Sequence, residues 1–214
     1  MLELSRVRFV ILIMACLIAR LPSASASYPA CSQIHAPTSL QLLLPSEGFK
    51  SPALSGLKLV EFDSTRDKKA TIQFISQIRQ KMGVHPFFTA DHRPLFSDLK
   101  NPELSYKNGL GELFLLKNEE GKIQGTIGFT MISPGSCELK KVYLHPDLRG
   151  FGLGRGLLEK VILRAKSLGF REMILQTNPV MNKAIEVYLK AGFRPFDSQS
   201  AATNARYYSL QLAP

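Results

Sequence analysis

A run of glycines between a strand and a helix limits most strongly what this chain of 214 residues can fold into. The stretch 137–144 predicts a strand, and the segment 149–156 after it holds four glycines and two arginines. Apolar residues at helical spacing follow, so a helix is expected to begin inside this run and to be closed by Gly169. Unobstructed backbone N–H groups at the positive end of a helix dipole form a natural cradle for a pyrophosphate.

The spacing of these glycines excludes two familiar phosphate loops. Counting from Gly150, the sixth residue is Arg155, and counting from Gly152 it is Leu157, so the dinucleotide pattern G-x-G-x-x-G is absent. No G-K-[ST] follows, which excludes a Walker A loop. Arg149 and Arg155 add positive charge, so the run predicts a phosphate-bearing ligand. A merely flexible loop explains the arginines and the helix less well.

The rest of the chain predicts an α+β, or mixed α/β, fold with helices on both faces of a sheet. A helix is expected over about 67–82, where Ile72, Ile75, Ile78 and Met82 share one face. Residues 84–108 hold three prolines and predict irregular chain with one short helix. The other expected elements are strands at 57–62, 112–117, 123–130, 172–177 and 206–212 and a second apolar helix at 182–191.

The N-terminal residues do not look like part of a domain. Arg6 and Arg8 precede the apolar run 9–19, and small residues follow at 24–26, so residues 1–27 resemble a signal peptide or another targeting segment. Eleven apolar residues span roughly 17 Å of helix, too little for the ~30 Å hydrocarbon core. A transit peptide and a mis-assigned start codon stay open, and with them export or a cytoplasmic or organellar location. A proline-rich linker is expected over 28–56 and a folded domain over 57–214.

Composition excludes some classes of function. The net charge is +10, and removing residues 1–26 leaves +8, so the basic character belongs to the folded part. A solvated basic surface explains this charge, and no stripe of basic and aromatic residues supports nucleic-acid binding. The three cysteines and four histidines show no metal-ligand spacing, so no metal is expected.

Three motifs together resemble the GNAT superfamily of N-acetyltransferases. Residues 149–154 resemble its R/Q-x-x-G-x-G/A signature, residues 138–146 the strand before it, and residues 182–193 its later N-x-x-A-x-x-x-Y-x-x-x-G-F helix. The resemblance is strong over 137–196 and weak before residue 110. It implies a central, mostly antiparallel sheet of about six to seven strands. It also implies transfer of an acetyl group from acetyl-CoA to a primary amine in a ternary complex.

The resemblance also implies which residues contact acetyl-CoA. The backbone N–H groups of Val142 and Leu144 would bind the pantetheine arm and the thioester carbonyl, although both can equally be core strand residues. Asn178 and Asn182 could bond the pantetheine amides, and Asn182 could instead be a helix N-cap. The full expected set is Val142, Tyr143, Leu144, Arg149, Gly150, Phe151, Gly152, Leu153, Gly154, Arg155, Asn178 and Asn182.

Two residues are expected to carry the chemistry by the same resemblance. Tyr188 corresponds to the general acid that protonates the departing CoA thiolate, and its alternative is a packed tyrosine at a helix end. Glu138 corresponds to a base that takes the proton of the amine, and its alternative is an exposed strand-end carboxylate. An amine must lose a proton before it attacks, so the reaction needs a base.

The acceptor and the assembly stay open. The acceptor is a small molecule or a protein, chosen by loops within 65–110 where no motif is recognisable. A homodimer is also left open, and no stable membrane span is expected. A rival hypothesis is an exported GNAT-fold binding module without catalysis, because acetyl-CoA is not expected outside the cytosol or an organelle.

Overall fold

Seven strands form one sheet in a computed structural model that describes residues 54–89, 94–107, 110–196 and 205–212. Their order is β1-β2-β3-β4-β5-β7-β6, and only β4 and β5 pair in parallel. The bounds are β1 (Lys58–Glu61), β2 (Gly111–Lys117), β3 (Ile123–Ser133), β4 (Ser136–Leu144), β5 (Glu172–Thr177), β6 (Arg194–Phe196) and β7 (Arg206–Gln211). The predicted fold class and strand number are confirmed.

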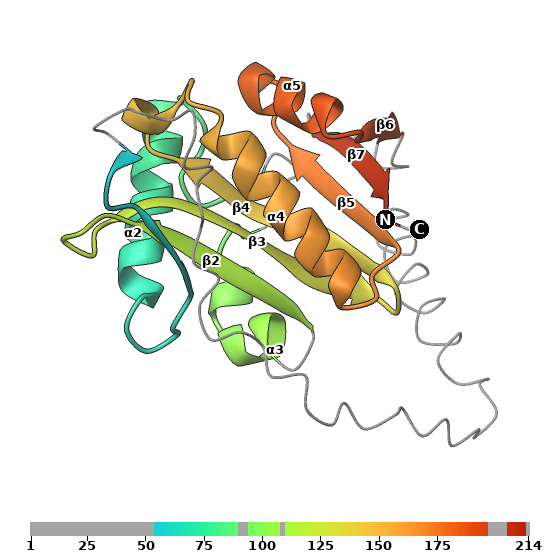
Figure 1. The fold of residues 1–214 in the computed structure, drawn as a ribbon, viewed down its shortest axis with the longest axis horizontal. Coiled ribbons are helices and arrows are strands. Elements are labelled where there is room, and N and C mark those ends of the chain that lie inside the picture. Colours follow the sequence, from blue (N-terminus) through green and yellow to red (C-terminus); the bar gives the residue numbers. More distant parts are fainter. Residues whose placement is uncertain (1–53, 90–93, 108–109, 197–204, 213–214) are drawn as a thin grey trace, which may run out of the picture. The chain divides into compact units, whose positions relative to one another are not determined.

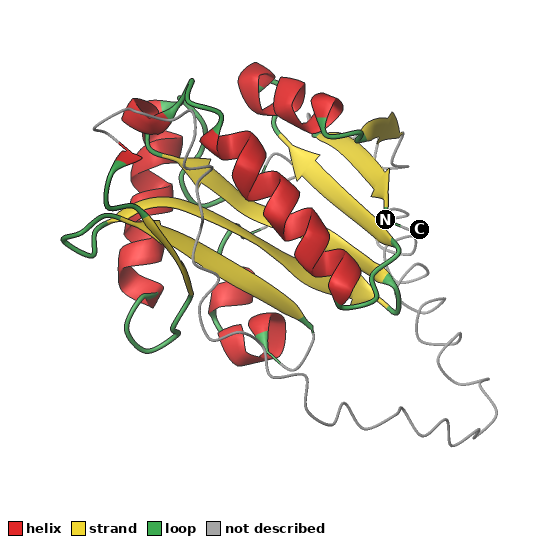
Figure 2. Cartoon of the chain, in the orientation of Figure 1, coloured by secondary structure: helices red, strands yellow, loops and turns green. Residues whose placement is uncertain are grey.

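Helices cover both faces of this sheet (Figures 1 and 2). On one face lie α2 (Lys68–Lys81) and α3 (Pro102–Tyr106), with the 3₁₀ turn η2 (Ser97–Leu99) between them in sequence. On the other face lie α4 (Leu153–Ser167) and α5 (Asn182–Lys190), and the 3₁₀ turn η3 (Pro146–Leu148) leads into α4. The predicted helices are therefore confirmed, with ends shifted by one or two residues.

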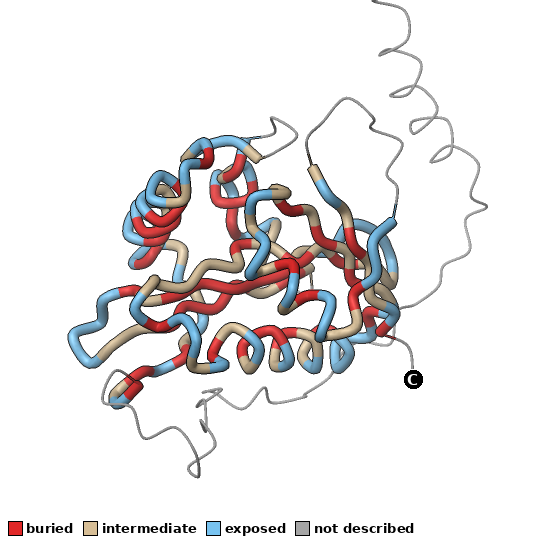
Figure 3. The backbone as a smooth tube through the Cα atoms, turned by 90° about the horizontal axis from the view of Figure 1, so that it is seen from above, coloured by how far each residue is buried: buried red, intermediate tan, exposed pale blue. Residues whose placement is uncertain are grey.

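Each face has its own apolar cluster, because alternate residues of a strand point to opposite sides. Phe74, Ile75 and Ile78 of α2 pack on Leu115 and Ile123. On the opposite face, α4 and α5 bury a larger cluster that includes Leu139, Leu158, Met173 and Tyr188. Buried residues accordingly follow the strands and the inner sides of the helices in Figure 3.

Two expectations about strands needed correction. β3 continues to Ser133 rather than ending at Thr130, and it reaches a tight turn at Gly135, whose φ is 85°. The edge strand β6 was not predicted, because three exposed residues including Pro195 show no alternation. Gly128 of β3 lies where the backbones approach closely, since a Cβ there would lie 2.6 Å from the Glu112 carbonyl oxygen.

The predicted targeting segment, Cys16, Cys31 and nearly all of the predicted linker lie outside the described residues. Leu54, near the linker's predicted end, is buried in the core cluster on the α4 face. None of the helices in the described ranges combines the length and apolarity needed to cross a bilayer.

Candidate active site

A β-bulge in the middle of β4 disturbs the sheet at its centre. Thr126 of β3 pairs with Tyr143 while Gly128 pairs with Lys140, so two β4 residues stand opposite Ile127 alone. One of the two, Lys141, has a φ of 57°. The Thr126 hydroxyl donates to the Lys141 carbonyl over 2.5 Å, which gives that carbonyl a partner where the ladder is irregular.

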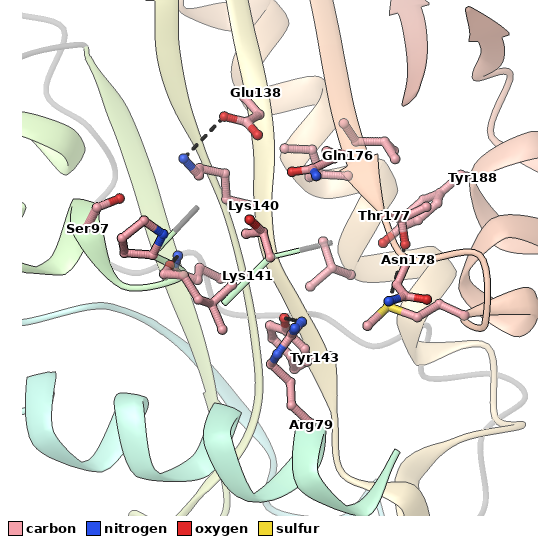
Figure 4. Close-up of a pocket in the computed structure, with 17 residues that line it drawn as sticks. Arg79, Ser97, Glu138, Lys140, Lys141, Tyr143, Gln176, Thr177, Asn178 and Tyr188 are labelled. Atoms are coloured by element: carbon pink, nitrogen blue, oxygen red, sulfur yellow. Dashed lines mark hydrogen bonds and ion pairs between the residues drawn. The ribbon is translucent and has the colours of Figure 1, made fainter. Parts of the chain in front are cut away.

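Beyond this point β4 and β5 separate. They pair only from Ser136 to Leu139 on β4 and from Glu172 to Leu175 on β5. A cavity of about 120 Å³ occupies the place where they part, lined by residues 138–143 of β4, 175–177 of β5 and the following Asn178 (Figure 4). Arg79 of α2 and Tyr188 of α5 also line it. Because α2 and α5 lie on opposite faces, the cavity is reached by groups from both sides of the sheet.

The cavity brings together the two residues predicted to carry the chemistry. Tyr188 is 6% exposed, and its ring packs edge-on against Phe193 with centroids 6.0 Å apart. Burial, and secondarily the nearby Tyr143, raises the pKa of Tyr188, so its phenol stays protonated at neutral pH. Glu138 lies on β4 with Oε2 3.2 Å from Lys140 Nζ.

A buried polar network fixes the wall on the α2 face. Lys141 Nζ lies 2.9 Å from Asp98 Oδ1, and their side chains are 1% and 6% exposed. Tyr106 donates its hydroxyl hydrogen to the other Asp98 oxygen, and Lys141 also donates to the Leu95 carbonyl. Burial lowers the pKa of Lys141, and the Asp98 carboxylate acts against this effect. The network ties the segment after residue 94 to the bulge.

Arg79 holds a second part of the wall. Its guanidinium donates to the carbonyls of His85 and Phe88 over 2.8 and 2.6 Å and to the Tyr143 hydroxyl over 3.0 Å. Burial raises the pKa of Tyr143, and the neighbouring guanidinium opposes that effect. Arg79 thus joins α2, the chain after it and β4 at one point.

The glycine-rich turn has the predicted strand-turn-helix form. Gly150 and Gly152 have φ values of 88° and 77°, and Gly152 occupies the N-cap position of α4. A Cβ on Gly150, Gly154 or Gly156 would meet no atom within 4 Å beyond the local helix backbone, so the surface of the turn is open. Both features suit the approach of a pyrophosphate to backbone N–H groups.

The two arginines of this turn contact protein groups. Arg149 donates through Nε and Nη2 to the Leu144 carbonyl, each over 3.2 Å. Arg155 Nε lies 2.7 Å from Glu159 Oε1, and this hydrogen bond raises the pKa of Arg155. Both side chains remain exposed at the turn, where their charge adds to that of the helix terminus.

The predicted acetyl-CoA residues fall in two places. Val142, Tyr143 and Asn178 line the cavity, whereas Leu144, residues 149–155 and Asn182 are not among its described lining residues. Asn182 is exposed at the first position of α5. Met181, and not Asn182, stands at the N-cap position, so the N-cap alternative for Asn182 is wrong.

Sequence reasoning missed Arg79, Asp98, Lys140 and Lys141 as parts of the site. Lys140 and Lys141 directly follow Glu138 and Leu139 in a recognised motif, and two consecutive lysines inside a core strand are a usable signal. Arg79 is an interruption of the apolar face of α2. Asp98 carries no signal, since it lies in a segment without periodicity.

The described residues provide no cluster of metal-binding side chains. The described residues contain no group of three or more His, Cys, Asp or Glu side chains that could hold one. Cys137 is buried in β4, and burial raises the pKa of its thiol to about 12. This thiol is therefore protonated and unreactive at neutral pH.

Comparison with known proteins decides the family. Residues 75–193 match the model of the acetyltransferase (GNAT) family, which is more than half of the chain. The chain belongs to the GNAT family of acetyltransferases. It is 31% identical over 119 residues to an uncharacterized N-acetyltransferase of Schizosaccharomyces pombe, a match covering 54% of this chain and 73% of that protein. Escherichia coli YjgM, also an uncharacterized N-acetyltransferase, is 28% identical over 69% of this chain and 85% of its own.

Solved structures show the same fold. A GNAT acetyltransferase of Staphylococcus aureus superposes with a TM-score of 0.63 and 26% identity over 73% of this chain and 99% of its own. A phosphinothricin acetyltransferase of Sinorhizobium meliloti, solved with acetyl-CoA, superposes with a TM-score of 0.55. It is 18% identical, and the match covers 74% of this chain and 89% of that protein. Membership of the acetyltransferase (GNAT) family makes this protein an acyltransferase with acetyl-CoA as its co-substrate.

Proposed function

We propose that this GNAT protein transfers an acetyl group from acetyl-CoA to a primary amine by direct attack in a ternary complex. The observation that carries this proposal is the cavity where β4 and β5 part. It is lined by the carboxylate of Glu138 and by the buried, protonated phenol of Tyr188. A proton acceptor and a proton donor thus line one cavity that is reached from both faces of the sheet.

Each group has a role in this reaction. Glu138 takes the proton that the acceptor's ammonium must lose before its nitrogen can attack the thioester carbon. Backbone N–H groups of Val142 and Leu144 stabilise the negative charge that develops on the carbonyl oxygen. Tyr188 donates its proton to the CoA sulfur as the C–S bond breaks. The turn 149–155 binds the pyrophosphate through N–H groups, with Arg149 and Arg155 adding charge.

The names of relatives do not supply the acceptor. They include an IAA acetyltransferase of Azospirillum brasilense, a mycothiol acetyltransferase of Cellulomonas flavigena and a spermidine N-acetyltransferase of Vibrio cholerae described as dodecameric. These acceptors share little chemistry, so the acceptor has to be inferred from the cavity of this chain. None of the described residues or relatives favours the binding-module alternative.

Two substitutions test the proposed chemistry in the full-length protein. Tyr188→Phe should lower kcat on the order of 10²-fold, the lower end of what general acids contribute, because a thiolate can leave without full acid help. Glu138→Gln should lower kcat by a similar factor, because the amine then lacks its base. The measurement is thiol release with mass detection of the acetylated amine.

The controls separate chemistry from folding and binding. Calorimetric acetyl-CoA binding should change less than about threefold in both variants. Tyr207→Phe on β7 and Glu186→Gln on the exposed side of α5 are matched changes outside the cavity, and both should keep wild-type kcat. Wild-type turnover by Tyr188→Phe would remove Tyr188 from the mechanism, and wild-type turnover by Glu138→Gln would do the same for Glu138.

A further inference from the structure

We infer that the acceptor is an amine that also carries a carboxylate, with α-amino acids as the class that fits, and that Lys140 selects it. This inference rests on the proposed function and names its second substrate. Its basis is the charge arrangement on the wall of the cavity at β4.

Glu138 and Lys140 form a pair of opposite charges inside the cavity. They are two residues apart on β4, so both side chains leave the same face of the sheet. Figure 4 shows them turned toward each other, with Oε2 and Nζ 3.2 Å apart. The side chains are only 14% and 24% exposed, so both charges are largely withdrawn from water.

Among the described residues of this wall, cations outnumber carboxylates. The described lining residues include Arg79, Lys140 and Lys141 but only one carboxylate, Glu138. Asp98 is not a lining residue, and its carboxylate forms an ion pair with Lys141. Among the described residues, the guanidinium of Arg79 donates to two carbonyls and a hydroxyl, all of them neutral. The cavity therefore favours a ligand that brings negative charge.

A purely cationic acceptor fits this arrangement poorly. Its ammonium would have to compete with Lys140 for Glu138, and the displaced Lys140 would be left without a partner in a largely buried place. Arg79 and Lys141 would repel it as well. Polyamines are thus disfavoured by the wall itself.

An α-amino acid would replace the ion pair between Glu138 and Lys140 by two ion pairs between the ligand and the protein. Its ammonium binds Glu138 while its carboxylate binds Lys140, so every buried charge keeps a partner. Glu138 then takes one proton from the ammonium, the N–C bond forms at the thioester carbon, and the C–S bond breaks. Tyr188 protonates the sulfur, and the second proton that the nitrogen loses on becoming an amide passes through solvent to restore the Tyr188 phenol. Glu138 returns its proton to solvent. Lys140 holds the carboxylate throughout, and the product amide leaves because it no longer carries the positive charge that bound Glu138.

The experiment compares acceptors that differ in the carboxylate alone. The full-length protein with saturating acetyl-CoA is given each standard amino acid and its decarboxylated amine, for example L-phenylalanine and phenethylamine, together with spermidine. We expect kcat/KM to be about 10- to 1,000-fold higher for at least one amino acid than for its decarboxylated partner, since a site built for a polar group rejects the analogue lacking it.

Variants at Lys140 then locate the preference. Lys140→Met should move the ratio of the two kcat/KM values toward one through a higher KM for the amino acid. Lys140→Arg should restore the ratio, which a loss of packing alone would not do. Lys122→Met, in the exposed turn before β3, removes the same charge elsewhere and should keep the wild-type ratio.

The outcomes distinguish the two proposals. Faster acetylation of spermidine or phenethylamine than of every amino acid overturns the acceptor class while the acetyltransferase function stands. Acetylation of no amino acid overturns it too. A Lys140→Met variant that slows all acceptors equally removes Lys140 as the selecting residue. Absence of acetyl-CoA binding together with absence of any acetylated amine overturns the proposed function itself.

Discussion

Lys141 has a backbone conformation that side chains other than glycine rarely adopt. Its φ of 57° lies in the left-handed region, which costs roughly 1–2 kcal/mol for an L-residue. The side chain offsets this cost through Asp98, the Leu95 carbonyl and the ring of Phe96, whose centroid lies 5.6 Å from Nζ. Strain and a buried ion pair thus meet at Lys141, the first of the two bulge residues, directly before Val142.

Two small substitutions measure these opposing contributions. Lys141→Gly and Lys141→Ala should both destabilise the protein, by about 3–5 kcal/mol, because each leaves Asp98 buried without its cation. Lys141→Gly should be the more stable of the two by about 1 kcal/mol, because glycine adopts this φ freely. Urea unfolding of both variants and the wild type measures the difference. An alanine variant as stable as the glycine variant would contradict strain at this position.

Some residues of the site could be predicted from the sequence, and others could not. Glu138, Tyr188 and the turn 149–155 lie in contiguous motifs, so a resemblance could assign them expected roles, and the structure places the first two in one cavity. Arg79 and Asp98 reach the same wall through partners 64 and 43 positions further along the chain, Tyr143 and Lys141. Contacts of this range depend on how the sheet and the helices pack, which no local pattern encodes.

At the scale of elements, an ion pair links the start of α2 to strand β2 of the sheet. Asp67, just before α2, accepts a hydrogen bond of 2.7 Å from Lys117 Nζ at the end of β2, and its side chain is 5% exposed. Burial acts to raise the pKa of Asp67, but the bonds from Lys117, the Asp63 N–H and Arg66 together lower it below its ordinary value. Since α2 carries Arg79, this link also supports the cavity wall.

Asp67 should therefore make stability depend on pH in the acid range. A carboxyl whose pKa is lowered on folding adds stability above its unfolded pKa of 3.8, and that stability is lost as pH falls through the folded pKa. Asp67→Asn should cost about 2 kcal/mol at pH 7. Urea unfolding between pH 7 and 2 should show this cost shrinking below about pH 4.

The matched control is Glu120→Gln in the exposed turn before β3, which should stay within about 0.5 kcal/mol of the wild type. A cost for Asp67→Asn that is the same at pH 7 and pH 2 would contradict the role of the charge.

Elements with a clear period were predictable, and irregular ones were not. The apolar positions of α2 and of α4, and the alternation in β5, gave elements within two residues of the observed bounds. The bulge in β4 escaped prediction because it is a mismatch of register between two strands. β6 escaped because it has three residues and no buried face.

At the scale of the whole domain, the site follows from the topology. A single parallel pair, β4 and β5, stands in an otherwise antiparallel sheet, and these two strands part after Leu139 and Leu175. The bulge and the glycine-rich turn into α4 belong to the chain from β4 to β5, and the cavity lies where these two strands part. The helices of both faces then supply Arg79 and Tyr188.

The central claim is that this segment binds acetyl-CoA at the turn and in the cavity, and calorimetric titration of the full-length protein tests it most directly. We predict saturable one-to-one binding by the wild type. Gly150→Val should weaken it at least about tenfold. Gly83→Val should not, although Gly83 after α2 also has a positive φ, 68° against 88° at Gly150, and equally open surroundings. The absence of binding by the wild type at millimolar acetyl-CoA would contradict the account.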